Sequence, residues 1–143
     1  MSTLSVIEKW VEVRSKVLDL GCGNGNILSE LQKTKDVIGL GVEIEEKNIE
    51  ECLLQNINVI EQNIDDGLIN FSNDSFDVVI LSQTIQVLKN PNNALEEITR
   101  IGKTCIVTIP NFGHWRSRPV SYTHLRAHET REDRVWRLLG EKK

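Results

Sequence analysis

The sequence predicts an α/β fold in which helices cover both faces of a mostly parallel β-sheet. Short apolar runs alternate five times with segments of helical periodicity along residues 4–109, and this alternation is typical of parallel strands joined by right-handed crossovers. The run FDVVIL at 76–81 is apolar on both faces, as expected for a central parallel strand. A glycine-rich turn, GCGNG at 21–25, joins the first strand to the following helix.

The first helix and the first strand are predicted from a change in the spacing of apolar residues. Residues 4–13 place their apolar side chains mostly on one helical face, whereas residues 16–20 form a short apolar strand that ends at the glycine turn. A second helix is expected over 26–32. The side-chain oxygen of Asn24 or Asn26 would cap it by accepting a backbone N–H.

The middle of the chain continues the alternation of strand and helix. Residues 37–44 are predicted to form the second strand, residues 45–55 a helix and residues 58–61 the third strand. The Asn-Asp-Ser sequence at 73–75 indicates a loop before the fourth strand.

The last strand–helix unit begins at a clear helix-start signal. Asn90 precedes Pro91, and proline is common in the first turn of a helix, so a helix is predicted over 94–101. Gly102 ends that helix, and residues 104–109 are predicted to form the fifth strand.

Residues 119–143 do not continue the alternation and are rich in arginine. The stretch SRPVSYTHLRAHET resembles translated adapter or vector sequence, so we expect the native chain to end near residues 116–118. Residues 1–118 would then form the domain, and residues 119–143 would be a non-native tail. The alternative is a genuine basic C-terminal helix with a weak apolar face, formed by Leu125, Val135, Trp136, Leu138 and Leu139.

The composition argues against several classes of function. Three widely spaced cysteines without a CxxC pair favour a reducing, cytoplasmic environment, where each is expected to be a small buried residue. The net charge of −4 argues against binding nucleic acid through charge. No apolar run approaches the roughly 18 residues of a membrane span, and no signal peptide is recognised.

The glycine turn is the strongest candidate for a ligand site. Glycine permits positive φ angles and close approach of a ligand to the backbone, and the following helix offers N–H groups. The G-x-G-x-G spacing differs from the G-x-G-x-x-G of dinucleotide sites, which argues against an NAD-dependent dehydrogenase. Asp19, two residues before the turn, would accept a hydrogen bond from the ammonium group of an amino-acid ligand, through water.

Glu43 ends the second strand and follows Gly21 at close to the roughly 20-residue spacing of nucleotide sites. An acidic side chain at that position accepts hydrogen bonds from both hydroxyls of a ribose. The alternative is that the glycines only make a turn and that Glu43 is a solvated strand-end residue.

These features resemble the class I S-adenosylmethionine (SAM)-dependent methyltransferases, whose first motif has the form of residues 17–25. The resemblance implies a Rossmann-like fold with SAM as the cofactor. It implies that the glycines line the methionine moiety, that Glu43 holds the ribose, and that Asn63, where the family often has aspartate, meets the adenine. The implied cofactor-binding residues are Asp19, Gly21, Cys22, Gly23, Gly25, Glu43, Asn63, Ile64, Asp65 and Ser82.

Three further stretches, VIEQNIDDGL, FDVVILSQTIQ and CIVTIPNFGHWRSR, resemble the MetW family of methionine biosynthesis proteins. The similarity runs over residues 5–118, and PNFGHWR is its most specific part. It implies a cytoplasmic protein that binds SAM and acts with homoserine O-acetyltransferase. It leaves open a SAM-dependent methyltransferase that acts on an unknown small molecule.

Catalytic candidates are few, because methyl transfer depends on alignment of the reacting atoms more than on an acid or base. A methyl acceptor would lie beyond the carboxyl ends of the fourth and fifth strands. Gln83 would orient it there, and His114 would accept a proton. The alternative for His114 is packing in a loop. No metal is expected at His124 and His128, because both lie in the tail.

A full class I sheet has seven strands, the last two forming an antiparallel pair beside the fifth. Only five strands can be read in this sequence, so we expect the final pair to be missing. The fifth strand would then expose unpaired backbone groups, which predicts poor solubility or dimerisation.

Overall fold

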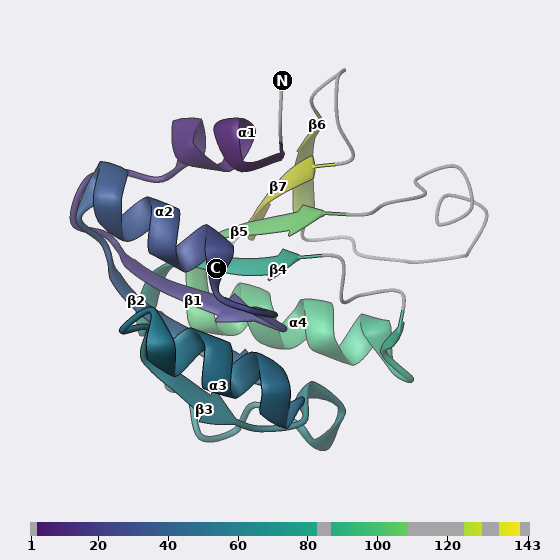
Figure 1. The fold of residues 1–143 in the computed structure, drawn as a ribbon. Coiled ribbons are helices and arrows are strands. Elements are labelled where there is room, and N and C mark those ends of the chain that lie inside the picture. The colour runs from purple at the N-terminus through teal and green to yellow at the C-terminus, as the bar shows by residue number, and fades with distance from the viewer. Residues whose placement is uncertain (1–2, 83–86, 109–124, 130–134, 141–143) are drawn as a thin grey trace.

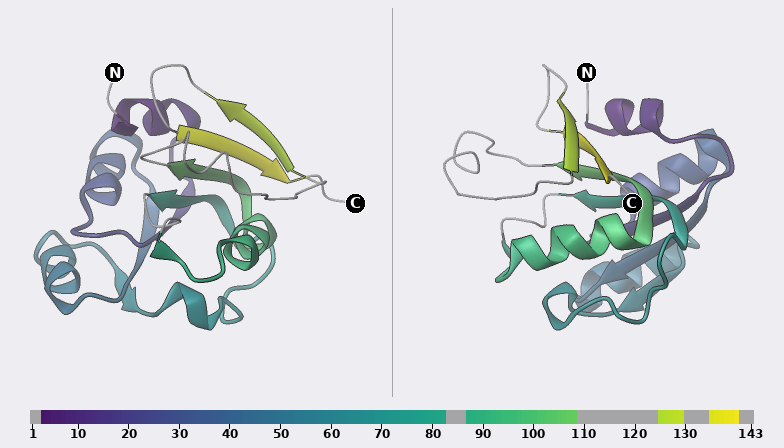
Figure 2. Two further views of the ribbon diagram at one scale, coloured as in Figure 1. Left: turned by 90° about the vertical axis from the view of Figure 1, so that its right-hand side faces the viewer. Right: turned by 180° about the vertical axis from the view of Figure 1, so that it is seen from behind.

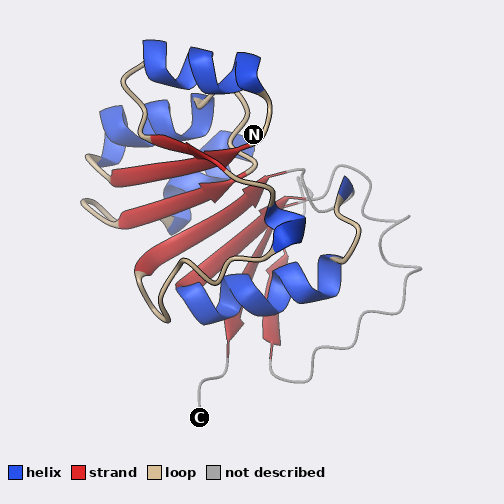
Figure 3. Cartoon of the chain, turned by 90° about the horizontal axis from the view of Figure 1, so that it is seen from below, coloured by secondary structure: helices blue, strands red, loops and turns tan. Residues whose placement is uncertain are grey.

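The computed structural model describes residues 3–82, 87–108, 125–129 and 135–140. It contains a seven-stranded sheet of order β3-β2-β1-β4-β5-β7-β6, with helices on both faces (Figure 1; Figure 3). The strands are β1 Lys16–Leu20, β2 Ile38–Glu43, β3 Val59–Glu61, β4 Phe76–Ser82, β5 Gly102–Thr108, β6 Leu125–Glu129 and β7 Val135–Gly140. The helices are α1 Thr3–Trp10, α2 Asn26–Lys35, α3 Glu46–Leu54, α4 Pro91–Ile101 and the 3-10 helix η1 Ile64–Asp66.

Strands β1 to β5 are parallel, which confirms the α/β class predicted from the sequence. The chain runs outward from β1 through β2 to β3, then returns to β4 on the other side of β1. The direction of winding therefore reverses between β1 and β4. Open α/β sheets bind their ligands at the carboxyl ends of the strands beside such a switch point.

The expectation that the final antiparallel pair is missing is wrong. Strand β7 pairs antiparallel with β5, and β6 pairs antiparallel with β7 (Figure 2). The edge of β5 offers backbone hydrogen bonds to these segments, and local periodicity does not reveal such long-range pairing. Because β5 has neighbours on both sides, the predicted exposed edge and its consequence for solubility lose their basis. The assignment of 119–143 as a non-native tail stays a prediction.

The core has two halves, one on each face of the sheet. Helices α1, α2 and α3 cover one face, where Ile7 and Leu28 pack with Val17 of β1. Helix α4 covers the other, where its apolar residues pack with Leu18 of β1. Neighbouring residues of β1 thus enter opposite halves, as the alternation of side chains along a strand requires. Among the described helices, none is long and apolar enough to cross a membrane.

Helix boundaries follow local hydrogen bonding. The predicted cap of α4 is confirmed, because the Asn90 side chain accepts the N–H of Asn93 and proline occupies the first turn. For α2 neither proposed residue is the cap, because Gly25 occupies that position without a side-chain hydrogen bond; Asn24, one residue earlier, accepts the N–H of Asn26 at 3.2 Å. Helix α1 ends at Trp10 rather than at residue 13, because Arg14 takes a positive φ of 65° and turns the chain into β1.

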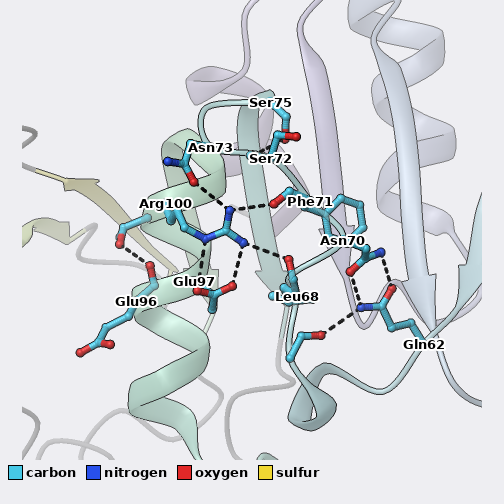
Figure 4. A network of polar contacts seen from close by, with 12 residues as sticks. Gln62, Leu68, Asn70, Phe71, Ser72, Asn73, Ser75, Glu96, Glu97 and Arg100 are labelled. Carbon is cyan, nitrogen blue, oxygen red and sulfur yellow. Dashed lines mark hydrogen bonds and ion pairs between the residues drawn. The ribbon is translucent and has the colours of Figure 1, made fainter.

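Arg100 of α4 joins the loop that follows β3 to this helix (Figure 4). Its guanidinium donates to the carbonyl oxygens of Leu68 and Phe71 at 2.9 and 2.7 Å, and to the side chains of Asn73 and Glu97. All five N–H donors of the side chain are therefore engaged. This network fixes the loop whose first residues lie at the carboxyl end of β3.

Candidate functional site

The glycine turn between β1 and α2 depends on backbone angles that other residues adopt with difficulty. Gly21, Gly23 and Gly25 have φ values of 72°, 58° and 86°, and L-residues with side chains are strained in this region. The turn is docked on the end of β2, because the N–H groups of Gly21 and Cys22 both donate to the carbonyl of Val42, at 2.8 and 3.0 Å.

Glu43 at the end of β2 faces the glycine turn. Its Oε1 accepts the N–H of Gly23 at 2.8 Å, while Oε2 accepts the N–H groups of Ile44 and Glu45 at 3.0 and 2.9 Å. The side chain is only 8% exposed. Three backbone N–H donors satisfy the carboxylate oxygens and fix the orientation of the side chain. Glu43 is therefore not the solvated strand-end residue of the alternative interpretation.

Two thiols hold the other side of the turn. Cys52 of α3 donates to the carbonyl of Gly23 at 3.2 Å, and its Sγ lies 3.7 Å from the Sγ of Cys22. Both cysteines are buried and free, as the sequence predicted. Burial raises the pKa of each thiol, so both stay protonated and able to donate. The carbonyl of Gly23 is thus held by Cys52, and its N–H by Glu43.

Asp19 of β1 lies beneath the turn in a different environment from Glu43. It is 0% exposed, and neither carboxylate oxygen has a hydrogen-bond partner among the described residues. Burial raises the pKa of Asp19 to about 8, and the charge of Glu43 adds to that effect. A buried carboxyl group without partners is costly in ionised form.

A cleft of about 410 Å³ opens at the carboxyl ends of β2 and β3. Five of the predicted cofactor-binding residues line it, namely Gly21, Glu43, Asn63, Ile64 and Asp65. Cys22, Gly23 and Gly25 lie in the adjoining turn, Asp19 lies beneath that turn, and Ser82 ends β4 beside Thr108. The catalytic candidates Gln83 and His114 lie outside the described residues.

Asn63 and Asp65 also have structural roles. Asn63 caps η1 by accepting the N–H of Asp65 at 3.0 Å. The carboxylate of Asp65 in turn accepts the N–H of Lys89 at 3.1 and 3.2 Å, which joins the far wall of the cleft to the segment before α4. Both residues shape the cleft, so their presence in it does not by itself assign them to a ligand.

The family model described as methionine biosynthesis protein MetW matches residues 2–132. The chain belongs to the MetW family. A curated relative, the bifunctional methionine biosynthesis protein MetXA/MetW of Rhodopirellula baltica, is 36% identical over 121 residues. That alignment covers 79% of this chain but 19% of the relative, so the chain spans about a fifth of that protein.

Solved structures similar to this MetW-family chain have the same fold. A TehB-like SAM-dependent methyltransferase from Corynebacterium glutamicum superposes with a TM-score of 0.74 and 17% identity, covering 98% of this chain and 86% of that one. A SAM-dependent methyltransferase from Aquifex aeolicus gives a TM-score of 0.71 and 17% identity, covering 94% and 88%. The Rossmann-like fold implied by the sequence resemblance is confirmed.

Several residues of the MetW-family cleft were missed in the sequence. Ile44 and Val87 are the informative ones, because both line the cleft although they are apolar and 54% and 76% exposed. An apolar residue immediately after Glu43, where a chain leaving a sheet is usually polar, was a usable signal for Ile44. Val87 had no such signal, because its place depends on the contact between Asp65 and Lys89. The other missed lining residues are Val42, Glu45, Asn48, Gln62 and Leu88.

No metal-binding group of three or more suitable side chains forms within the described part of this MetW-family chain. His128 lies in β6, and His124 falls outside the described residues. The cleft instead combines the carboxylates of Glu43, Glu45 and Asp65 with exposed apolar surface. Such a lining suits an uncharged or cationic nucleoside better than a pyrophosphate, which the carboxylates would repel.

Proposed function

We propose that this chain binds SAM in the cleft and acts with homoserine O-acetyltransferase in methionine biosynthesis. The observation that carries the proposal is the direct contact between Glu43 and the glycine turn, at the mouth of a cleft. This contact brings together the two features on which a SAM site depends, although they come from different strands. The similarity to solved SAM-dependent methyltransferases supports the choice of cofactor.

The ribose of SAM would lie against Glu43. Each carboxylate oxygen accepts about two hydrogen bonds, and Oε1 receives only the N–H of Gly23 from the described residues. One acceptor position on Oε1 is therefore left for a ribose hydroxyl. A second hydroxyl would compete with one of the existing backbone donors.

The adenine would lie farther from the glycine turn, between the exposed side chains of Ile44 and Val87. Covering both faces of an aromatic base with apolar side chains removes the base and both side chains from water. The edge of the base would then reach Asn63 and Ile64 at the end of β3. The methionine part would extend over the glycine turn toward Asp19.

The Rhodopirellula baltica relative supports the proposed partner. Its printed name joins MetXA and MetW in a single bifunctional protein, and two activities fused in one chain are held at high effective concentration. We propose that the MetXA portion corresponds to homoserine O-acetyltransferase and that the present chain associates with the same enzyme. SAM derives from methionine, so binding it would let the chain report methionine supply to that enzyme.

A second candidate function is methyl transfer to a small molecule, which the similarity to solved methyltransferases favours. Purified acetyltransferase should be assayed with and without this chain, and with and without SAM, while S-adenosylhomocysteine formation is followed in parallel. Changed acetyl transfer without S-adenosylhomocysteine supports the regulatory role. S-adenosylhomocysteine formed at more than one equivalent per chain supports methyl transfer instead.

Replacing Glu43 with alanine should weaken SAM binding by about 1–3 kcal/mol, because the ribose loses a charged acceptor and the N–H of Gly23 loses its partner. Isothermal calorimetry with SAM, S-adenosylhomocysteine and NAD measures the effect and tests the choice of cofactor. Glu46→Ala is the matched control, because Glu46 is an exposed glutamate three residues further along the chain that does not line the cleft. Equal affinities in the wild type and Glu43→Ala would remove Glu43 from the site.

A further inference from the structure

Two carboxyl groups near the glycine turn, those of Glu43 and Asp19, differ in whether they have hydrogen-bond partners. Glu43 accepts three backbone N–H groups. Asp19 is fully buried, and both of its oxygens lack a partner among the described residues. In β1 it lies in register between Gly41 of β2 and Ile80 of β4, which supply no polar side chain.

Among the described residues, the titratable groups near Asp19 bring no positive charge to it. They are Glu43 from β2, Cys22 from the glycine turn and Cys52 from α3. Burial is the larger influence on the pKa of Asp19, and Glu43 adds to it. With its pKa raised above neutral, Asp19 keeps its proton at pH 7.

We infer that binding of the amino-acid part of the cofactor is coupled to the release of a proton from Asp19. The inference rests on the proposed function, because it assumes a ligand with an ammonium group at the glycine turn. The ammonium, directly or through one water, supplies the donors and the positive charge that the Asp19 carboxylate lacks. Asp19 then gives its proton to solvent, and the resulting carboxylate is paired with the ammonium.

The coupling makes affinity depend on pH in a defined direction. Below the pKa of Asp19 the free protein must lose a proton in order to bind, so the dissociation constant rises roughly tenfold between pH 7 and pH 6. Roughly one proton per ligand is released in this range. Adenosine, which has the nucleoside but no ammonium group, should bind without either effect.

Calorimetry on the full chain tests this, with S-adenosylhomocysteine and adenosine as probes at pH 6 and pH 7. Each titration is run in two buffers of different ionisation enthalpy, because the difference in observed heat gives the number of protons released. The expected result is release of a proton with S-adenosylhomocysteine and none with adenosine.

Asp19→Asn should abolish both the release and the tenfold pH dependence. Asp77→Asn, at the opposite end of the sheet, should keep them.

The outcomes separate the inference from the proposed function. Failure of S-adenosylhomocysteine to bind at either pH overturns the proposed function. Binding with equal affinity at both pH values and without proton release leaves that function intact but overturns the coupling. If Asp19→Asn does not fold, the two-buffer measurement on the wild type still decides, because it needs no variant.

Discussion

At the scale of single residues, the same side-chain chemistry behaves differently according to the backbone around it. Glu43 leaves β2 where the chain turns, so the N–H groups of Ile44 and Glu45 point at its carboxylate. Asp19 lies within β1, where the backbone groups are committed to neighbouring strands and none is left for the side chain. The carboxyl group at the strand end therefore has backbone hydrogen-bond donors, and the one inside the strand has none among the described residues.

The raised pKa of Asp19 predicts how stability changes with pH. Its folded-state pKa, about 8, exceeds the unfolded value, so the folded state holds the proton more tightly. The resulting stabilisation is fully present below about pH 4 and is lost as pH rises toward about 8, at up to roughly 1.4 kcal/mol per pH unit. Asp19→Asn should therefore gain stability relative to the wild type between pH 5 and pH 8.

Urea denaturation of both proteins across that pH range measures the difference, and groups that titrate equally in both proteins cancel. A difference in unfolding free energy that stays constant with pH would show that Asp19 ionises normally in the folded protein.

At the scale of elements, α4 and the loop after β3 are joined by apolar packing and by the hydrogen bonds of Arg100. Arg100→Ala should lower the free energy of unfolding by about 2–4 kcal/mol, because it leaves the carbonyls of Leu68 and Phe71 and the carboxylate of Glu97 without their donors. The matched control is Lys33→Ala. That change removes an exposed pair with Glu30 at the same i,i+3 spacing and should cost less than about 1 kcal/mol.

Thermal or urea unfolding distinguishes the two variants. Similar, small losses in both would mean that the Arg100 network adds no more than a surface ion pair. Because the same loop carries Gln62 and Asn63 into the cleft, Arg100→Ala should also weaken SAM binding, although Arg100 does not line the cleft.

The elements also explain which parts of the fold could be predicted from the sequence. Strands β1 to β5 were predictable, because each has a short apolar run and a local turn or helix signal beside it. Strands β6 and β7 were not, because they form by pairing with β5, which is distant in the sequence. The same limit applies to the site. Spacing located Glu43, but the contact between Asp65 and Lys89 that shapes the cleft spans 24 residues and has no local signal.

At the scale of the whole molecule, the sheet depends on the segment after residue 118 for the neighbour of β5. A chain ending at residue 118 would lack β6 and β7 and expose the edge of β5, whose inner residues Cys105 and Val107 are buried. Such an edge favours association between chains. The shortened chain should therefore dimerise or aggregate, as measured by light scattering against the full chain at equal concentration. A monodisperse, folded monomer would show that this neighbour is dispensable.

Both backbone polar groups of Gly23 are hydrogen-bonded before any ligand arrives: its N–H donates to Glu43, and its carbonyl accepts from Cys52. A receptor whose binding loop is already rigid loses little conformational entropy on association. SAM should therefore enter a preformed site, and loss of either hydrogen bond should show itself first as faster dissociation rather than as slower association.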